Sequence, residues 1–236
     1  MASLISVIIP VAVLNDRLRG ITKETIYRLL TNTRTPVEII VIDNGSKHLQ
    51  PGIDHERVEW KGPRENIHPY YFKELQGNPG AWNRGLERSK GDILVAMDND
   101  VYVPEGWDIE MTKHFADPNV GCVVPGVEGS QNDRAGFCIM FPREVYNKVG
   151  GFDERFNPAF FEDNDFFLRI KQAEKVMVCA KSTMVEHVGG GSNTVYKSLD
   201  LAQAFDDSRA KFFEKWGFKT VDEANKAIEE NIQIRP

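Results

Sequence analysis

Residues 91–104, GDILVAMDNDVYVP, join a short apolar run to three consecutive polar side chains. The apolar part, residues 93–97, has the length and composition of a strand buried inside a parallel sheet. It ends at Asp98, Asn99 and Asp100. Side chains two residues apart on an extended chain point the same way, so both carboxylates would face one site if the chain stays extended there. The stretch predicts a buried strand with two carboxylates at its tip.

Three kinds of site are compatible with this tip. Hard oxygen ligands suit Mg²⁺ or Mn²⁺, which often bridges to phosphate oxygens. Two close carboxylates raise each other's pKa unless a cation or a hydrogen-bond donor compensates, so a catalytic pair is a second option. Asp and Asn are also common in turns, because their side chains bond to nearby backbone. The stretch alone leaves these alternatives open.

Two similar apolar runs precede it, residues 4–9 and residues 37–42. A helix that begins at residues 22–25 separates them, and this order is typical of a right-handed crossover between parallel strands. The second run ends at Asp43. Ligands of open α/β sheets bind beyond the carboxyl ends of the strands, so we expect Asp43 at the same edge as Asp98. It would either accept hydrogen bonds from a base or ribose, or only cap the next element.

The segment between the second and third runs is polar and aromatic. We expect a short strand at residues 57–60, followed by a long loop that reaches residue 76. Residues 80–89 then predict a helix that leads into the strand at 93–97.

The second half of the chain predicts short elements with no repeat, low-complexity stretch or linker. The expected strands cover residues 120–125, 135–141 and 175–180, and the expected helices cover residues 142–149, 162–173, 198–216 and 221–231. Because no linker divides the chain, both halves should share one core. The expected fold class is α/β: a single domain with a central, mostly parallel sheet flanked by helices, with further helices at the C-terminus.

Two other groups could carry chemistry. Glu162 and Asp163 begin a predicted helix directly after Phe160 and Phe161. Acids at a helix N-terminus are stabilised by the macrodipole by ~0.3–1 kcal/mol each, which is a sufficient structural reason for them. A partly buried start could instead make one of them a general base, which a nearby cation would keep ionised. His187, just before a run of glycines, is either structural or a metal ligand.

Bulk properties narrow the class of protein. The 236 residues carry a net charge of -6, which does not favour nucleic acid as a partner but leaves a local basic groove open. Cys122, Cys138 and Cys179 fit neither a disulfide framework nor a zinc site, and indicate a reducing compartment. Since no apolar run reaches the ~20 residues of a membrane span, we expect a cytoplasmic protein, with contact at a membrane surface left open.

Taken together and in order, six segments resemble the inverting family 2 glycosyltransferases, which have the GT-A fold. They are ISVIIPV, VEIIVIDNGS, NPGAWNRGLERSKGDILVAMDNDVYVPEGW, GGFDERFNPAFFEDNDFFLRI, VEHVGGGS and FFEKWG. The resemblance implies one GT-A-like catalytic domain over residues 1–236. Residues 1–100 would bind the nucleotide sugar, residues 101–190 the acceptor and the catalytic groups, and residues 191–236 would form the C-terminal helices.

The resemblance also implies roles for individual residues. Asp163 would be the catalytic base, paired with Glu162. Asp100 would coordinate Mn²⁺ or Mg²⁺ directly, with Asp98 and His187 as further ligands. The residues implied in binding the nucleotide or the donor sugar are Pro10, Val11, Asp43, Asn78, Gly80, Asn83, Arg84, Asp98 and Asn99.

The implied reaction is a single in-line displacement, in which a sugar moves from a nucleotide diphosphate to an acceptor hydroxyl with inversion. A carboxylate at Asp43 suits the imide N–H of uracil or thymine, so UDP- or dTDP-sugars are favoured as donors. The acceptor is a glycan or another hydroxyl compound, and a nucleic-acid acceptor is not favoured but stays open. The sequence does not determine the oligomeric state.

The chain departs from the family pattern at two places. Residues 11–16, VAVLND, stand where the family commonly has an aromatic residue and Asn, and this departure concerns the implied nucleotide contacts there. Residues 63–76 are longer and more aromatic than the usual link, and we interpret them as an acceptor or donor lid.

Three other functions share some of these sequence features. An apolar strand ending Asp-x-Asp also resembles the haloacid dehalogenase-like phosphohydrolases, in which Asp98 would be phosphorylated, but there the motif normally follows the first strand. A nucleotidyltransferase would need a glycine-rich phosphate loop after the first strand, which is absent from residues 10–20. The third is a protein that binds a nucleotide sugar or glycan without turnover.

Overall fold

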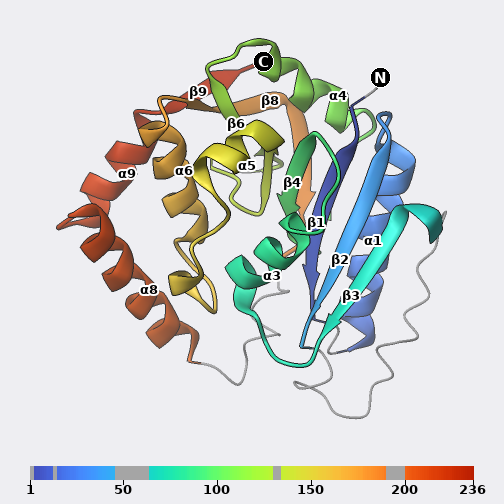
Figure 1. Cartoon of the computed structure of the whole chain (residues 1–236), viewed down its shortest axis with the longest axis horizontal. Coiled ribbons are helices and arrows are strands. Elements are labelled where there is room, and N and C mark those ends of the chain that lie inside the picture. The colour runs from blue at the N-terminus through green and yellow to red at the C-terminus, as the bar shows by residue number, and fades with distance from the viewer. Residues whose placement is uncertain (1–2, 13–14, 46–63, 130–133, 190–199) are drawn as a thin grey trace.

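The structure is a computed structural model of the chain, and it describes residues 3–12, 15–45, 64–129, 134–189 and 200–236 (Figure 1). Within these residues, nine strands form one sheet in the order β3-β2-β1-β4-β7-β6-β8-β5, with β9 paired to β8. The strands are β1 Ile5–Val11, β2 Val37–Asn44, β3 Ile67–Phe72, β4 Ile93–Met97, β5 Val101–Tyr102, β6 Val120–Val127, β7 Cys138–Pro142, β8 Val176–His187 and β9 Ile232–Arg235. The sheet is mostly parallel, as expected, because only the pairs β4–β7, β6–β7 and β5–β8 are antiparallel.

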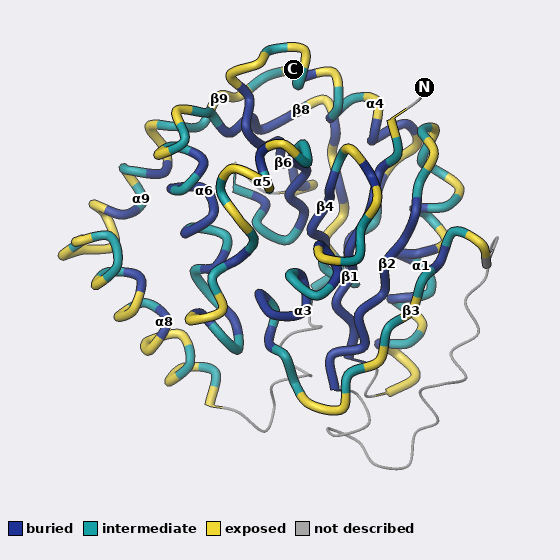
Figure 2. Tube along the Cα trace, viewed as in Figure 1, coloured by how far each residue is buried: buried dark blue, intermediate teal, exposed yellow. Residues whose placement is uncertain are grey.

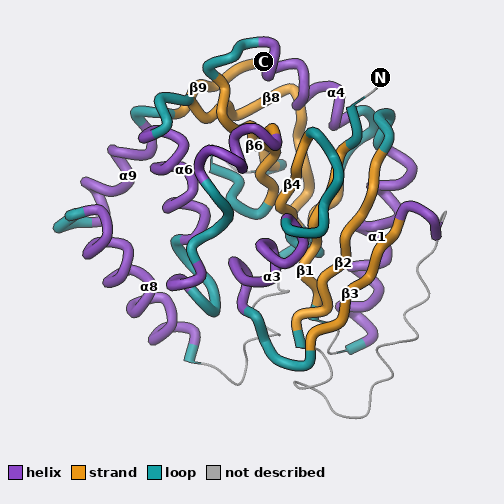
Figure 3. Tube along the Cα trace, in the orientation of Figure 1, coloured by secondary structure: helices purple, strands orange, loops and turns teal. Residues whose placement is uncertain are grey.

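Helices cover both faces of the sheet (Figures 1 and 3). They are α1 Asp16–Asn32, α3 Gly77–Leu86, α4 Trp107–Thr112, α5 Arg143–Val149, α6 Glu162–Gln172, α8 Leu201–Trp216 and α9 Val221–Glu229, with short 3-10 turns η2 Arg64–Asn66, η3 Lys113–Ala116 and η4 Glu154–Phe156. Helix α1 lies on one face, and α3, α5 and α6 lie on the other, with α8 and α9 outside α6. In the part of the chain that the structure describes, no helix is both long enough and apolar enough to cross a bilayer.

The core consists of two apolar layers, one on each face of the sheet. Alternation along a strand separates them: Val7 and Val95 belong to one layer, Ile8 and Leu94 to the other. The central strands are buried along most of their length (Figure 2). Helix α3 approaches β1 closely because Gly85 has no side chain; a Cβ there would lie 2.2 Å from Cγ2 of Ile8.

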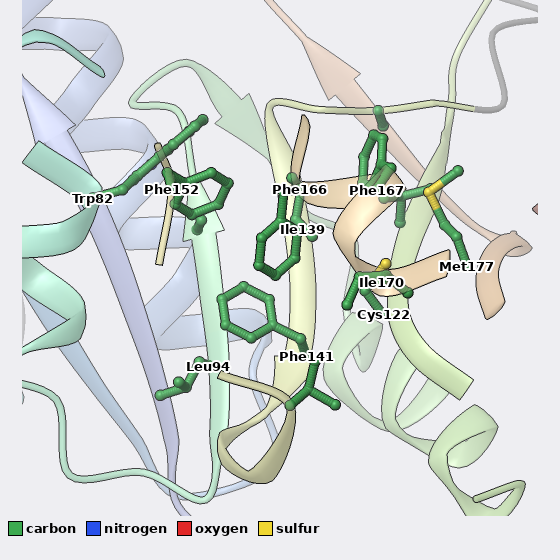
Figure 4. Packing of buried hydrophobic residues seen from close by; sticks show 14 of the residues in the cluster. Trp82, Leu94, Cys122, Ile139, Phe141, Phe152, Phe166, Phe167, Ile170 and Met177 are labelled. Atoms are coloured by element: carbon green, nitrogen blue, oxygen red, sulfur yellow. The ribbon is translucent and has the colours of Figure 1, made fainter. Parts of the chain in front are cut away.

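The layer beneath α6 is rich in aromatic rings (Figure 4). Phe166 of α6 lies 5.0 Å from Phe141 of β7 and 4.9 Å from Phe152, measured between ring centroids. Phe152 in turn lies 4.7 Å from Trp82 of α3. Such tilted ring pairs are favourable beyond the area they bury. They fix α6, and therefore the acids at its N-terminus, against the sheet.

The predicted start of the first helix was wrong. Helix α1 begins at Asp16, because the side chain of Asn15 accepts a hydrogen bond from the backbone N–H of Leu18 at 2.9 Å and caps the helix. Asp16 in the first turn adds favourable charge. Residues 22–25, expected as the helix start, lie inside the helix instead.

The prediction of a long loop before the second helix was also wrong in part. Residues 67–72 form β3, which pairs in parallel with β2 and lies at the end of the sheet. An edge strand has only one neighbour and tolerates Pro69, and its side chains are mostly half-buried or exposed, so its composition resembled that of a loop. Residues 67–72 are therefore part of the sheet, not of a lid. The short strand predicted at residues 57–60 lies outside the described residues.

The helices and strands in the second half of the chain follow the predicted order, with some elements that were not predicted. Strand β8 extends to His187 because it pairs first with β6 and then with β5. Helix α4 and the short strands β5 and β9 were not predicted. The two C-terminal helices were predicted correctly; residue 198, the expected start of the first one, lies outside the described residues.

Candidate functional site

A turn follows β4 and carries the first pair of acids. The chain does not stay extended beyond β4, which was the condition for both carboxylates to face one site as strand neighbours. Asn99 and Asp100 instead form a turn before β5. The backbone N–H of Asp98 donates to the carbonyl oxygen of Phe137 at 2.8 Å, and the amide of Asn99 donates to the hydroxyl of Thr22 at 2.8 Å. The Asn99 side chain therefore anchors the turn to α1, and its implied donor contact stays a prediction.

Strand pairing brings His187 to this turn. The antiparallel pairing of β5 with β8 places His187 opposite Val101, and the N–H of Val188 donates to the carbonyl of Asp100 at 3.0 Å. Nε2 of His187 lies 3.2 Å from Oδ1 of Asp100. Three potential ligand atoms lie within 4.8 Å of one another, one from each of Asp98, Asp100 and His187. Two carboxylates and an imidazole fit Mn²⁺ well, whereas Mg²⁺ generally prefers oxygen ligands only.

Electrostatics of this group also fit a cation. The pKa of Asp98 is raised to about 7, mainly by burial and also by the charges of Asp100 and Asp163, while the charge of His187 and a hydrogen bond from Asn78 act to lower it. Burial alone would lower the pKa of His187, but its hydrogen bond to Asp100 and the charges of Asp100 and Asp98 outweigh burial and raise it. Negative charge is concentrated here, and a bound cation would stabilise it.

The second acidic pair begins α6. Phe160 and Phe161, just before it, have φ angles of 77° and 68°, a left-handed conformation that costs of order 1–3 kcal/mol for each such residue. The carboxylate of Asp163 lies against Gly136: a Cβ on this glycine would be 1.9 Å from Oδ2. Oδ1 of Asp163 accepts a hydrogen bond from the N–H of Asn164 at 2.7 Å. The aspartate is therefore held in one orientation.

Both acids of this pair have raised pKa values. Burial raises the pKa of Glu162 well above its usual range, and the charges of Asp163 and Asp98 add to the shift. Its Oε2 atom is buried and has no hydrogen-bond partner among the described residues. Burial also raises the pKa of Asp163, opposed by backbone hydrogen bonds and by the charge of Arg134. Arg134 is the nearby cation that the sequence could not identify.

One pocket joins the two acidic groups. It has a volume of about 270 Å³. Its lining combines acids and amides with aromatic rings: Asn78, Trp82, Asp98, Gly136, Phe137, Ala159, Phe160, Phe161, Glu162, Asp163, Asn164 and Phe205. Asp98 belongs both to this pocket and to the candidate metal centre. A ligand in the pocket would therefore be near both Asp98, a member of the candidate metal centre, and Asp163.

The implied nucleotide-binding residues of the first two strands lie side by side. Val11 pairs with Asp43, and Pro10 pairs with Ile42, at the carboxyl ends of β1 and β2. Asp43 is buried, with 6% of its surface exposed. The three candidates Pro10, Val11 and Asp43 thus share one edge of the sheet.

The implied donor residues of α3 divide into two groups. Asn78 lines the pocket, and its side chain hydrogen-bonds to Asp98 and to Glu162. Gly80, one turn into the helix, lies near Glu154: a Cβ on this glycine would be 3.6 Å from Oε2 of Glu154.

Asn83 and Arg84 form the second group, directed at the segment after α5. The side chain of Asn83 donates to and accepts from the backbone of Phe152, at 2.8 Å each, and Nη1 of Arg84 lies 3.3 Å from Oε1 of Glu154. Neither residue lines the pocket of about 270 Å³. The structure gives them contacts that hold this segment, and their implied role at the donor stays a prediction.

Several pocket residues were missed by sequence reasoning, among them Trp82, Gly136, Phe137 and Phe205. Phe137 stacks on the imidazole of His187, with ring centroids 4.0 Å apart and planes 23° apart. Nothing in the local sequence distinguishes these residues from ordinary core or turn residues. They are revealed only by the packing of α3, α8 and the residues just before β7 around the pocket.

The chain is similar to known proteins in both sequence and fold. The family model described as glycosyl transferase family 2 matches residues 6–177. The O-antigen biosynthesis protein RfbC of Myxococcus xanthus is 24% identical over 230 residues, covering 78% of this chain and 17% of that protein. The uncharacterized protein y4gI of Sinorhizobium fredii is 25% identical over 222 residues, covering 72% of this chain and 23% of that protein. The chain thus spans less than a quarter of either relative.

Two solved structures share the fold. The mannosyltransferase PcManGT from Pyrobaculum calidifontis, in complex with GDP-Man and Mn²⁺, has a TM-score of 0.62 at 17% identity, over 98% of this chain and 79% of that one. GalNAc-T7 with UDP, GalNAc and Mn²⁺ also has a TM-score of 0.62 at 17% identity, over 79% of this chain and 44% of that one. At this identity the likeness concerns the GT-A fold alone.

Proposed function

Since the chain belongs to glycosyl transferase family 2, we propose that it is a metal-dependent, inverting glycosyltransferase. The observation that carries the proposal is the convergence of Asp98, Asp100 and His187 within 4.8 Å, beside a pocket that also contains Asp163. Metal-dependent transfer from a nucleotide diphosphate sugar uses a cation at the diphosphate and a base at the acceptor hydroxyl. The chain brings candidates for both to one pocket.

Asp100, Asp98 and His187 would hold Mn²⁺ or Mg²⁺, with Mn²⁺ favoured by the imidazole. When bound, such a cation neutralises charge on the diphosphate leaving group. The solved structures of the two fold neighbours both contain Mn²⁺, which supports this proposal.

Asp163 would act as the general base. Its carboxylate takes the proton of the acceptor hydroxyl while the hydroxyl oxygen bonds to the anomeric carbon and the bond from that carbon to the diphosphate breaks. Attack opposite the leaving group inverts the anomeric configuration. Gly136 and the N–H of Asn164 hold the carboxylate, so much of the rate would come from positioning.

The nucleotide would bind at the edge formed by Pro10, Val11 and Asp43. A carboxylate there can accept the imide N–H of uracil or thymine, so we favour UDP- or dTDP-sugars. Residues 1–100 would then hold the donor, residues 101–190 the acceptor and the catalytic groups, and residues 191–236 the supporting helices. The O-antigen biosynthesis protein among the relatives supports a glycan acceptor.

The test is to incubate the chain with Mn²⁺ and a panel of UDP-, dTDP- and GDP-sugars, with and without simple glycosides, and to measure nucleotide release. We expect release that depends on metal, stops with EDTA and is nearly lost in Asp163→Asn. The anomeric configuration of the product, read by NMR, tests inversion. Nucleotide binding without release would favour the non-catalytic binding protein, and hydrolysis of simple phosphomonoesters would favour the phosphohydrolase.

A further inference from the structure

One wall of the pocket is aromatic and has no part in the proposed chemistry. Phe160 and Phe161 come from the segment before α6, and Phe205 comes from α8. Ring centroids of Phe160 and Phe205 lie 5.4 Å apart, and those of Phe161 and Phe205 lie 5.2 Å apart. Phe205 nevertheless keeps 40% of its surface exposed. We call Phe160, Phe161 and Phe205 the aromatic wall.

The chain holds this wall in an unfavourable conformation. Phe160 and Phe161 both have positive φ, which bulky residues adopt only when the surroundings enforce it. Helix α8 provides that enforcement: the buried hydroxyl of Ser208 donates to the carbonyl of Ala159 at 3.0 Å, and Phe212 packs against Phe161 at 5.2 Å. Backbone strain of this kind is common where a ligand is clamped.

Two residues that line the pocket each carry a buried polar atom without a partner in the ranges that the structure describes. Oε2 of Glu162 and Nε1 of Trp82 are buried without a hydrogen-bond partner in the described part of the chain. A buried donor or acceptor without a partner is destabilising, so such atoms often mark the place of a ligand. The pair offers one acceptor and one donor, which together match the hydroxyl groups of a polyol.

We infer that this pocket binds one pyranose ring of the acceptor, with its C–H face against the aromatic wall and its hydroxyls at Glu162 and Trp82. A pyranose has an apolar face and a hydroxyl-bearing edge, which this lining matches; a lipid chain would leave the polar atoms without partners. The pocket of about 270 Å³ is smaller than the ~300–1,000 Å³ of sites for drug-sized ligands, so it suits a single ring.

The ring is assigned to the acceptor because Phe160 and Phe161 directly precede Glu162 and Asp163, and Asp163 must reach the acceptor hydroxyl. This inference rests on the proposed function for that assignment. Phe205 is then a specificity-determining residue contributed by the C-terminal helices.

The experiment measures binding of the methyl α- and β-glycosides of glucose, galactose and mannose by NMR titration, and binding of UDP with Mn²⁺ by calorimetry. Proteins compared are the wild type, Phe205→Ala and Phe205→Leu, the last retaining apolar volume without an aromatic face. Tyr27→Ala removes another half-exposed aromatic ring, on α1, and serves as the matched control. Thermal unfolding checks that each variant is folded.

We expect at least one glycoside to bind the wild type. Phe205→Ala should weaken that binding about tenfold, because the pyranose ring loses an aromatic surface on which to stack. Phe205→Leu should weaken glycoside binding less, and Tyr27→Ala should not weaken it at all. The affinity for UDP with Mn²⁺ should stay within twofold of the wild-type value in all variants. The inference is overturned if no glycoside binds, if both Phe205 variants bind it as the wild type does, or if Phe205→Ala weakens UDP–Mn²⁺ equally. Glycoside binding that depends on Phe205, without any nucleotide binding, would support the ring site and refute the proposed function.

Discussion

Nε2 of His187 lies 3.2 Å from Oδ1 of Asp100, although the two residues belong to different halves of the chain. The pairing of β5 with β8 creates this contact, because it aligns His187 with Val101, the residue after Asp100. The imidazole thereby joins two carboxylates that a single turn already brings together. The metal centre we propose is thus completed by an antiparallel strand pair.

Removal of either side chain should therefore weaken metal binding. We expect Asp100→Asn and His187→Ala each to reduce Mn²⁺ affinity by about 10–100-fold or more, since each removes a proposed ligand. Calorimetric titration of Mn²⁺ measures this directly. Asp222→Asn, which removes an exposed carboxylate of α9, is the control and should bind Mn²⁺ as the wild type does. Equal affinity in all four proteins would contradict the site.

Asp163→Asn should lower kcat by about 10²–10⁴-fold, the usual contribution of a general base. Mn²⁺ affinity should change little, because Asp163 is not among the proposed ligands. Single-turnover sugar transfer with saturating donor gives the rate of the chemical step. A near wild-type rate would show that another group removes the proton.

The pH dependence of kcat/KM should show the raised pKa of Asp163. A general base works only when deprotonated, and burial raises its pKa above the ordinary 3.8. Activity should therefore be present at neutral pH and fall as pH decreases through a value above 3.8, earlier than for an exposed aspartate. With Mn²⁺ held saturating at every pH, the residual activity of Asp163→Asn should lack this decrease at low pH. If the decrease persists in that variant, it belongs to another group.

Gly136→Ala should impair catalysis without removing any reacting group. The new Cβ would lie 1.9 Å from Oδ2 of Asp163, so the carboxylate must move. A displacement of about 1 Å can cost about 10²-fold in rate, and we expect a fall in kcat of that order. Gly20→Ala is the matched control, since nothing lies within 4 Å of its Cβ. A kcat in Gly136→Ala equal to that of Gly20→Ala would mean that Asp163 has no fixed position.

Asp165→Asn should destabilise the whole fold. Asp165 is fully buried, and its carboxylate lies 2.6 Å from Nζ of Lys215 and 2.8 Å from Nε of Arg169 and accepts from Nε1 of Trp216 at 2.9 Å. Loss of one partner of a buried ion pair costs about 3–5 kcal/mol.

Denaturant unfolding measures this loss as a decrease in the free energy of unfolding. The control is Glu105→Gln, which breaks an exposed pair with Arg34 and should cost less than about 1 kcal/mol. If Asp165→Asn cost no more than this control, the buried network would not anchor α8 to α6.

Much of the fold could be predicted from local patterns. The apolar run at residues 93–97 coincides with β4, and the helix that begins at Glu162 was placed correctly, because short apolar runs and 3.6-residue periodicity report local geometry. The start of α1 and the strand β3 could not be placed in this way. The start of α1 depends on the N-cap residue Asn15, which the prediction from the apolar pattern did not include. Residues 67–72 form a strand only because β2 provides a hydrogen-bonding partner for their backbone.

The sequence by itself determined the family, through six segments in order along the chain. It also determined the mostly parallel α/β sheet and the acids at the ends of β2 and β4, since these follow from residue types over a few positions. Only the tertiary structure decided which of those residues meet. It placed His187 beside Asp100, Gly136 against Asp163 and Phe205 in the pocket wall, and it directed Asn83 and Arg84 to the segment after α5. Contacts between such distant residues depend on strand register and helix packing, which the whole core determines and no local pattern contains.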